Sequence, residues 1–303
     1  MSEIPVPDAE DPTGVFVEHR ELLFGVVYNM LGSVADTEDV LQDTWLSWSR
    51  RGPDGIDNPR AYLVRIAVNH ALQRRAVVNR RRETYVGPWL PEPLVADGTS
   101  DDDPALRTES VSLAMLVVLE SLSPLERAVF VLHEVFGYAH TEIAEIIDRA
   151  PAAVRQLAHR ARAHVHARRP LYEAHPRVRR EATERFVRAA IGGDIAELME
   201  ILAPDVTVWT DGGGMRKQAL RPVHGRDKAA RLLSGYAKRG GAQHRDLDLR
   251  FRRVNGDDAA VLFEHGSPYA VIVLDLTPEG DRVSNLFVVT NPDKLTHVQK
   301  EEA

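Results

Sequence analysis

The chain has 303 residues, of which 44% are hydrophobic and 27% are charged, a balance typical of soluble globular proteins with about two domains. It contains no cysteine, which excludes disulfide frameworks, cysteine-ligated zinc sites and thiol nucleophiles, and favours a reducing compartment. The net charge of −7 argues against nucleic acid as a partner only if that charge is spread evenly.

The acidic excess is confined to two segments. Residues 1–11 carry four acidic side chains and no basic one, and residues 86–110 carry six against a single arginine. Residues 60–82 hold seven arginines and no acid, and residues 149–169 hold six arginines, three histidines and no acid. Two basic stripes on an acidic chain predict contacts with phosphate groups.

Membrane, export and metal signals are weak. No apolar run approaches the roughly 18 residues that a spanning helix needs, and residues 1–13 are acidic and proline-rich, unlike an export signal. We therefore expect a cytoplasmic protein with no membrane partner. The histidines lack the spacing of a closed metal site, so we predict no metal ion and no cofactor.

Residues 12–85 are predicted to form a helical domain of about four helices. Apolar residues recur at helical spacing up to Gly32, which provides a stop. Acidic residues at 36–39 open a second helix, where negative charge suits the amino end, and it runs to about Trp48. A third helix begins at Pro59, behind an asparagine cap.

A proline-rich, acidic stretch at 86–110 predicts a linker, and a second helical domain is expected at 111–172. Ser123-Pro124-Leu125-Glu126 has the pattern of a capping box. A short helix, a tight turn and a basic helix from Pro151 follow. Two helices joined by such a turn predict a helix-turn-helix.

Residues 175–303 change to a mixed pattern. Two helices precede a β-rich segment at 206–210, another helix covers 225–239, and four strands follow, with Asn255-Gly256 as a hairpin turn. Helices on one face of a mostly antiparallel sheet predict an α+β domain. The expected fold class is therefore multidomain, with two all-α helical domains followed by an α+β domain.

The basic helix of the helix-turn-helix presents a polar face that suits the major groove of DNA. Arg155, His159 and Arg162 recur at helical spacing opposite the apolar stripe, and Gln156 and Arg160 lie beside them. Arginine can bond guanine edges and glutamine adenine edges. A solvated basic helix would show the same pattern, so this face alone does not decide the function.

Three motifs occur in order along the helical part. Residues 36–45 read Asp-Thr-Glu-Asp-Val-Leu-Gln-Asp-Thr-Trp, residues 58–63 read Asn-Pro-Arg-Ala-Tyr-Leu, and residues 122–124 read Leu-Ser-Pro, ahead of the helix-turn-helix. Together they resemble region 2 and region 4 of the bacterial extracytoplasmic-function sigma factors, the promoter-recognition subunits of RNA polymerase. The resemblance implies core RNA polymerase and promoter DNA, with its −10 and −35 elements, as partners.

The resemblance also assigns residues to each partner. Those expected to bind polymerase are Asp36, Glu38, Asp39, Gln42, Asp43 and Trp45. Those expected to bind DNA are Arg60, Arg65, Asn69, Arg74, Arg75, Arg80, Arg81, Arg155, Gln156, His159, Arg160 and Arg162. Ala139, Asp148 and Ala150 depart from the capping residues and turn glycine usual in region 4, and a missing cap costs about 1 kcal/mol.

Three further motifs resemble a subgroup of these sigma factors that carries a SnoaL-like carboxyl-terminal domain. They are Tyr-Val-Gly-Pro-Trp-Leu-Pro-Glu-Pro-Leu at 85–94, Asp211-Gly212-Gly213-Gly214 and Asn291-Pro292-Asp293-Lys294-Leu295. The resemblance implies a cone-shaped α+β fold around an apolar pocket that could take a small ligand. Asp211 could act there as a general base or begin a glycine turn that docks on another part of the chain. We favour docking for both turns and assign no catalytic residue.

The leading interpretation is a transcription initiation factor, not an enzyme, whose third domain modulates its activity. One alternative is a SnoaL-like isomerase or cyclase with a fused DNA-binding regulator. Another is a one-component regulator that senses a small ligand without the polymerase. Residues 36–45 discriminate among them, because only a sigma factor needs a polymerase-binding face there.

Overall fold

The structure is a computed structural model that describes residues 11–96, 111–168, 175–243 and 247–298. These residues form two compact units. The helical unit contains the described residues up to Asn79 and Leu122–Ala163. The sheet unit contains the described residues of Arg80–Arg107, Val111–Ser121 and His164–Ala303. Among the helices described, none combines the length and the hydropathy that a bilayer span demands.

Three helices make up the first part of the chain, α1 (Pro12–Leu31), α2 (Val34–Arg51) and α3 (Pro59–Glu83). α1 ends at Gly32 in the left-handed conformation, as predicted. α2 begins two residues before the predicted acids because the Ser33 side chain accepts a hydrogen bond from the Asp36 amide. The described residues hold three helices where about four were expected, since α3 is one continuous helix of 25 residues.

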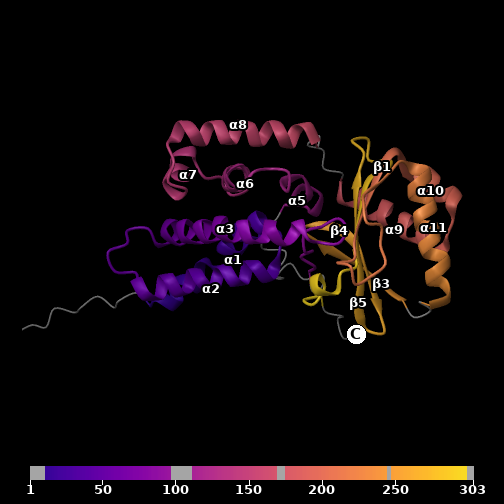
Figure 1. The fold of residues 1–303 in the computed structure, drawn as a ribbon, viewed down its shortest axis with the longest axis horizontal. Coiled ribbons are helices and arrows are strands. Elements are labelled where there is room, and N and C mark those ends of the chain that lie inside the picture. The colour runs from indigo at the N-terminus through magenta and orange to yellow at the C-terminus, as the bar shows by residue number, and fades with distance from the viewer. Residues whose placement is uncertain (1–10, 97–110, 169–174, 244–246, 299–303) are drawn as a thin grey trace, which may run out of the picture. The chain divides into compact units, whose positions relative to one another are not determined.

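The helix-turn-helix consists of α6 (Pro124–Phe130), the π-helical turn η1 (Val131–Val135), α7 (His140–Ile146) and α8 (Pro151–Arg168) (Figure 1). The predicted capping box of Ser123 and Glu126 is present. Asp148, in the turn before α8, has φ of 51°, a conformation that favours glycine. Ala139 offers no capping side chain, but its amide still donates to Glu142 Oε2 at 2.7 Å, which keeps half of a capping box.

The sheet unit is built on six strands in the order β2-β1-β6-β5-β4-β3. β1 and β6 run parallel and the other neighbours are antiparallel, so the predicted α+β class is confirmed. β2 was not predicted, because two residues are too few to show a strand period. The bounds are β1 Leu202–Asp211, β2 Val223–His224, β3 Leu247–Val254, β4 Asp257–Glu264, β5 Ser267–Leu276 and β6 Val283–Val289.

Helices cover one face of the sheet, namely α9 (Pro176–Gly192), α10 (Ile195–Ile201) and α11 (Arg226–Gln243) (Figure 1). Neighbouring strand residues alternate between the two faces. Leu286 of β6 packs among the helices, whereas Phe287 lies in the core on the opposite face. Both faces are therefore buried.

The opposite face is covered by the first residues of the predicted linker. Every residue from Leu90 to Ala96 is buried, and Leu90 and Val95 share a core with Phe263 of β4. Residues 86–96, the first part of the predicted linker, are therefore docked on the sheet, which the prolines among them did not indicate. The acidic run at 101–103 lies outside the described residues.

α5 (Leu113–Leu119) packs on the same face of the sheet. Its residues Leu113 and Ala114 belong to the core that contains Leu90. The helical segment predicted at 111–172 is therefore divided, with its first helix in the sheet unit and its helix-turn-helix in the helical unit. Both ends of the linker are held by one sheet.

Candidate nucleic-acid interface and the linker network

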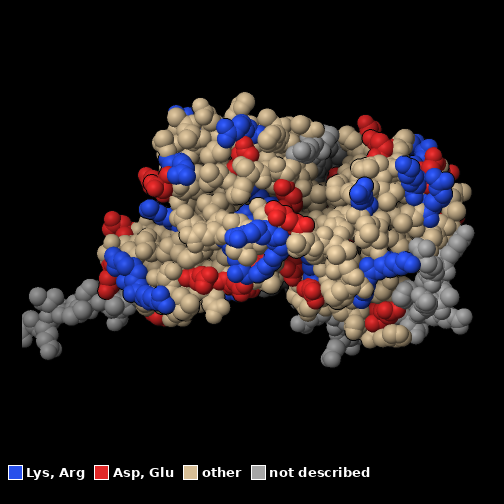
Figure 2. Space-filling model, viewed as in Figure 1, with Lys and Arg blue, Asp and Glu red and all other residues tan. Residues whose placement is uncertain are grey.

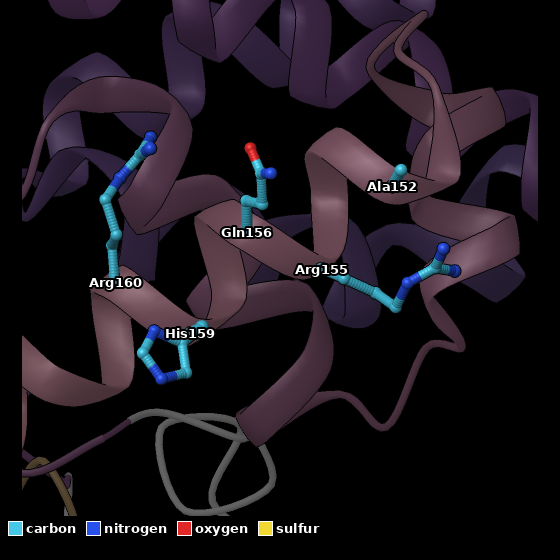
Figure 3. Close-up of a pocket in the computed structure, with 5 residues that line it drawn as sticks. All are labelled: Ala152, Arg155, Gln156, His159 and Arg160. Carbon is cyan, nitrogen blue, oxygen red and sulfur yellow. The ribbon is translucent and has the colours of Figure 1, made fainter.

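The outer face of α8 carries the predicted DNA-reading side chains. Arg155, Gln156 and His159 are exposed, and with Ala152 and Arg160 they line an open hollow of about 460 Å³ (Figure 3). The opposite face of α8 buries Val154, Leu157, Ala158, Ala161 and Val165, as the sequence pattern predicts. The amphipathic helix therefore leaves a polar face free for a groove.

Two arginines of α8 serve the fold of the helix-turn-helix as well. Arg160 Nε lies 2.8 Å from Glu126 Oε1, and Arg162 Nε lies 2.6 Å from Glu134 Oε1. Burial raises the pKa of Glu126, but hydrogen bonds from Ser123 and Arg160 outweigh it and hold that pKa below its usual range. These partners neutralise part of the basic face, and Arg155 and Gln156 remain exposed on it.

The arginine stripe of α3 does not form one continuous basic surface. Arg65, Arg80 and Arg81 are exposed, whereas Arg74 donates to Asp36 and Asp39 of α2. Figure 2 likewise shows acidic side chains next to basic ones on the visible face of the helical part. Part of the arginine stripe therefore forms ion pairs with the acidic side chains of α2.

Arg75 was predicted to bind DNA, but the structure buries it. It is only 4% exposed, and its guanidinium donates to the backbone oxygens of Met30 and Leu31 at 3.1 and 3.3 Å. Burial lowers its pKa to about 10. Arg75 faces the core because α3 packs against α1 on that side, which helical periodicity alone did not reveal.

Two other predicted DNA contacts of α3 lie against the helix-turn-helix within the helical unit. Asn69 Nδ2 donates to Ile146 O at 3.3 Å, and the Arg60 guanidinium lies 5.8 Å from the centre of the Tyr138 ring. A residue without a predicted role joins the helix-turn-helix to α1 in the same unit. Arg127 is 1% exposed and its Nε donates to Asn29 O at 2.8 Å.

The predicted polymerase-binding residues of α2 also fall into an exposed group and a group that packs within the fold. Glu38, Asp39, Gln42 and Asp43 are exposed. Asp36 is buried beside Arg74, and Trp45 packs on Phe16 with ring centres 5.3 Å apart. Asp36 and Trp45 thus contribute to the fold, and the exposed side chains are those available to a partner.

Asp211, at the end of β1, is the centre of a buried network. It is fully buried, with 0% exposure. Its Oδ1 accepts from Tyr85 Oη at 2.5 Å, and its Oδ2 accepts from the Leu90 amide at 2.9 Å and from Lys294 Nζ at 2.7 Å. The Asn291 amide group donates to Tyr85 Oη at 2.7 Å. These five residues are called the Asp211 network below.

The network joins the linker to the two predicted docking turns. The Trp89 ring centre lies 3.3 Å from the Arg82 guanidinium carbon and 4.1 Å from Lys294 Nζ, so two cations contact one indole. The glycine turn has no room for a side chain at Gly213, because a Cβ there would lie 2.5 Å from the side-chain nitrogen of Asn291. Sequence reasoning placed both turns but missed that Lys294 and Tyr85 meet on Asp211.

The same geometry disfavours catalysis by Asp211. Both of its oxygens already accept hydrogen bonds from groups of the protein, including the Gly213 amide at 3.1 Å. A general base needs an oxygen within reach of the substrate proton, and none is exposed here. The docking interpretation fits this carboxylate better.

Comparisons with known proteins identify the family. Family models for "Sigma-70 region 2" and "Sigma-70, region 4" match residues 15–82 and 112–165. The protein "ECF RNA polymerase sigma factor SigJ" of Mycobacterium tuberculosis is 36% identical over 288 residues, covering 91% of both chains. The chain belongs to the extracytoplasmic-function (ECF) RNA polymerase sigma factors. The "Probable ECF RNA polymerase sigma factor SigI" of the same species is 28% identical and covers 93% of this chain and 94% of its own.

The crystal structure of M. tuberculosis SigJ matches this sigma factor as a whole. Its TM-score is 0.75 at 32% identity, with 94% of this chain and 98% of that chain covered. The likeness spans the helical regions and the sheet unit together. The predicted multidomain class is confirmed, and a fused enzyme is disfavoured because the relatives of this length are sigma factors.

Lys294 gives this sigma factor an expected pH dependence. Burial outweighs the attraction of Asp211 and lowers the pKa of Lys294 to about 8, from 10.5 for a free lysine. Between these two values the unfolded chain binds more protons than the folded one, so the free energy of unfolding should rise with pH in that window. The raised pKa of Tyr85 keeps its hydroxyl protonated there. Urea unfolding between pH 7.5 and 9.5 measures the rise.

Two variants isolate the contribution of Lys294. Lys294→Met should remove the rise in unfolding free energy, whatever it does to absolute stability. Lys217→Met, which changes an exposed lysine of the same unit, should keep it. Equal pH slopes in Lys294→Met and the unmodified protein would contradict the assignment.

Proposed function

We propose that the protein binds core RNA polymerase and directs it to promoters, with the helical unit contacting both polymerase and DNA. The observation that carries the proposal is the exposed face of Arg155, Gln156 and His159 on α8, in a chain with both sigma regions. A recognition helix of this kind reads base edges in the major groove. The proposed place of action is the cytoplasm, and a chain without cysteine suits that reducing compartment.

The proposed contact with core polymerase is the exposed part of α2. Gln42 and Asp43 are solvent-exposed side chains on the helix that matches the polymerase-contacting stretch. An acidic surface next to DNA would repel phosphate, so a protein partner suits it better. Asp39 also accepts a hydrogen bond from Arg74, so it contributes to the fold as well.

Base reading by α8 is tested on duplexes selected from a random pool for binding to this protein. Arg155→Ala and Gln156→Ala should each weaken binding to the selected duplex by about 1–3 kcal/mol, because each removes base-edge hydrogen bonds. They should also relax the base preference at one position. Fluorescence anisotropy at fixed salt measures the affinities.

Arg162→Ala is the matched control for these substitutions. It lies on the same helix but is paired with Glu134, so its effect on affinity should be smaller and similar for selected and unselected duplexes. If Arg155→Ala also weakened all duplexes equally, α8 would be a phosphate-binding helix and not a base reader.

We further propose that the Asp211 network regulates initiation through the linker. Residues 84–96 follow α3 and residues 111–121 precede α6, and both segments pack on the sheet. Docking therefore fixes the points from which the two helical regions extend. Undocking would replace these fixed points with a flexible tether, which changes the effective concentration of one region near the other.

A further inference from the structure

A second feature of the sheet unit lies on the helix-covered face, away from the linker. It is a partly open cavity of about 240 Å³ between α9, α11 and the sheet. Apolar side chains form most of its wall, among them Phe186, Leu233, Ile272 and Leu286. An apolar cavity of about 150 Å³ accepts benzene, so this cavity has room for a molecule with a single ring.

The polar part of the wall includes an acceptor, the Gln218 side-chain oxygen, for which the described part of the chain offers no donor. Thr290 Oγ1 donates to the backbone oxygen of Asp211 at 3.2 Å, so it can only accept from Gln218. The Gln218 amide nitrogen, 3.0 Å away, therefore faces Thr290. Its oxygen, Oε1, is left buried and has no hydrogen-bond partner among the described residues. A buried acceptor without a donor is costly, and a ligand could supply the donor.

Charge on the wall is sparse. Among the described residues that line the cavity, only Lys217 is charged, and its side chain is exposed to solvent. A buried carboxylate would therefore have no buried cation to pair with, which is strongly unfavourable. The wall suits a neutral molecule.

The wall is hydrogen-bonded to the Asp211 network. Gln218 donates to Thr290, and the Thr290 hydroxyl and amide both donate to the Asp211 backbone oxygen, at 3.2 and 2.8 Å. The backbone amide of Asn291 donates to the same oxygen at 3.0 Å. A ligand that fixes the Gln218 side chain would therefore restrain the residue that holds the linker.

We propose that the cavity binds a neutral, mainly apolar molecule of single-ring size that donates one hydrogen bond to Gln218, and that its binding strengthens the Asp211 network. The binding stands on the cavity alone, whereas its regulatory consequence rests on the proposed function. By linkage, a ligand that favours the docked linker is itself bound more tightly when the linker is docked.

Three small probes test the site on the full chain: phenol, toluene and benzoate. Titrations followed by the methyl resonance of Ile272 should show binding of phenol and toluene, with phenol roughly threefold to tenfold tighter because of its hydroxyl donor. Benzoate should not bind. Tightest binding of benzoate, or no shift of Ile272 with any probe, would overturn the proposal.

Matched variants locate the binding. Gln218→Leu should abolish the preference for phenol while toluene still binds, and a preference that survives would remove Gln218 from the site. Ala190→Phe should fill the cavity and stop all binding. Val178→Phe, on the exposed side of the same helix, should leave it unchanged, and loss of binding in this control would overturn the location.

Hydrogen exchange of residues 84–96 tests the coupling. Saturating phenol should slow exchange there in the unmodified protein and leave it unchanged in Gln218→Leu. Unchanged or faster exchange in the unmodified protein would overturn the coupling. If no probe binds but Asp211 variants still alter transcription, this inference alone is contradicted. If the probes bind but the protein does not associate with core polymerase, the proposed function alone is contradicted.

Discussion

Replacing Asp211 with alanine should lower the melting temperature by on the order of 10 °C and release the linker from the sheet. The substitution leaves the Lys294 ammonium buried without its carboxylate, and breaking a buried ion pair costs about 3–5 kcal/mol. At this size of chain, each kcal/mol corresponds to roughly 2–4 °C. Calorimetry measures the first effect, and faster hydrogen exchange at residues 84–96 measures the second.

Two controls separate the network from a general loss of stability. Asp205→Ala removes an exposed carboxylate of the same strand and should change neither quantity much. Asp211→Asn keeps one acceptor oxygen, for either Tyr85 or Leu90, and loses the charge. Its effect on both quantities should fall between those of Asp205→Ala and Asp211→Ala. A large drop in melting temperature with unchanged exchange at residues 84–96 would mean that Asp211 supports the sheet and does not hold the linker.

The second large effect is expected at α2. The double variant Gln42→Ala with Asp43→Arg should lose co-purification with core RNA polymerase, with affinity reduced at least roughly thirtyfold, because removing one side of a charged contact typically costs 2–5 kcal/mol. Both side chains are exposed, so the fold should be retained. Circular dichroism checks the fold and a pull-down with purified core polymerase checks the binding.

Asp205→Arg carries the same change of charge at an exposed site in the sheet unit, and it should bind core polymerase normally. Undiminished association of the double variant would remove α2 from the polymerase interface. It would also favour the regulator that acts without polymerase.

The elements set by local chemistry were predictable from the sequence. Gly32, the capping box at Ser123 and the Asn255-Gly256 turn each act within a few residues. The exposed face of α8 was predictable too, because its apolar and polar residues separate at helical spacing.

The missed features depend on residues far apart in the chain. Leu90 and its acceptor Asp211 are 121 positions apart, and Arg74 and Arg75 are adjacent yet one pairs with acids and the other is buried. Periodicity assigns a residue to a side of a helix but does not say what covers that side. Trp89, a large aromatic residue in the acidic, proline-rich segment, was a local hint of docking.

Run-off transcription with purified core RNA polymerase on a selected duplex tests the central claim most directly. The full chain should yield a promoter-dependent transcript, the Gln42→Ala with Asp43→Arg variant should yield none, and Asp211→Ala should change the amount relative to the unmodified protein. No promoter-dependent transcript from the full chain would contradict the sigma-factor account, and equal output from Asp211→Ala would contradict control through the linker.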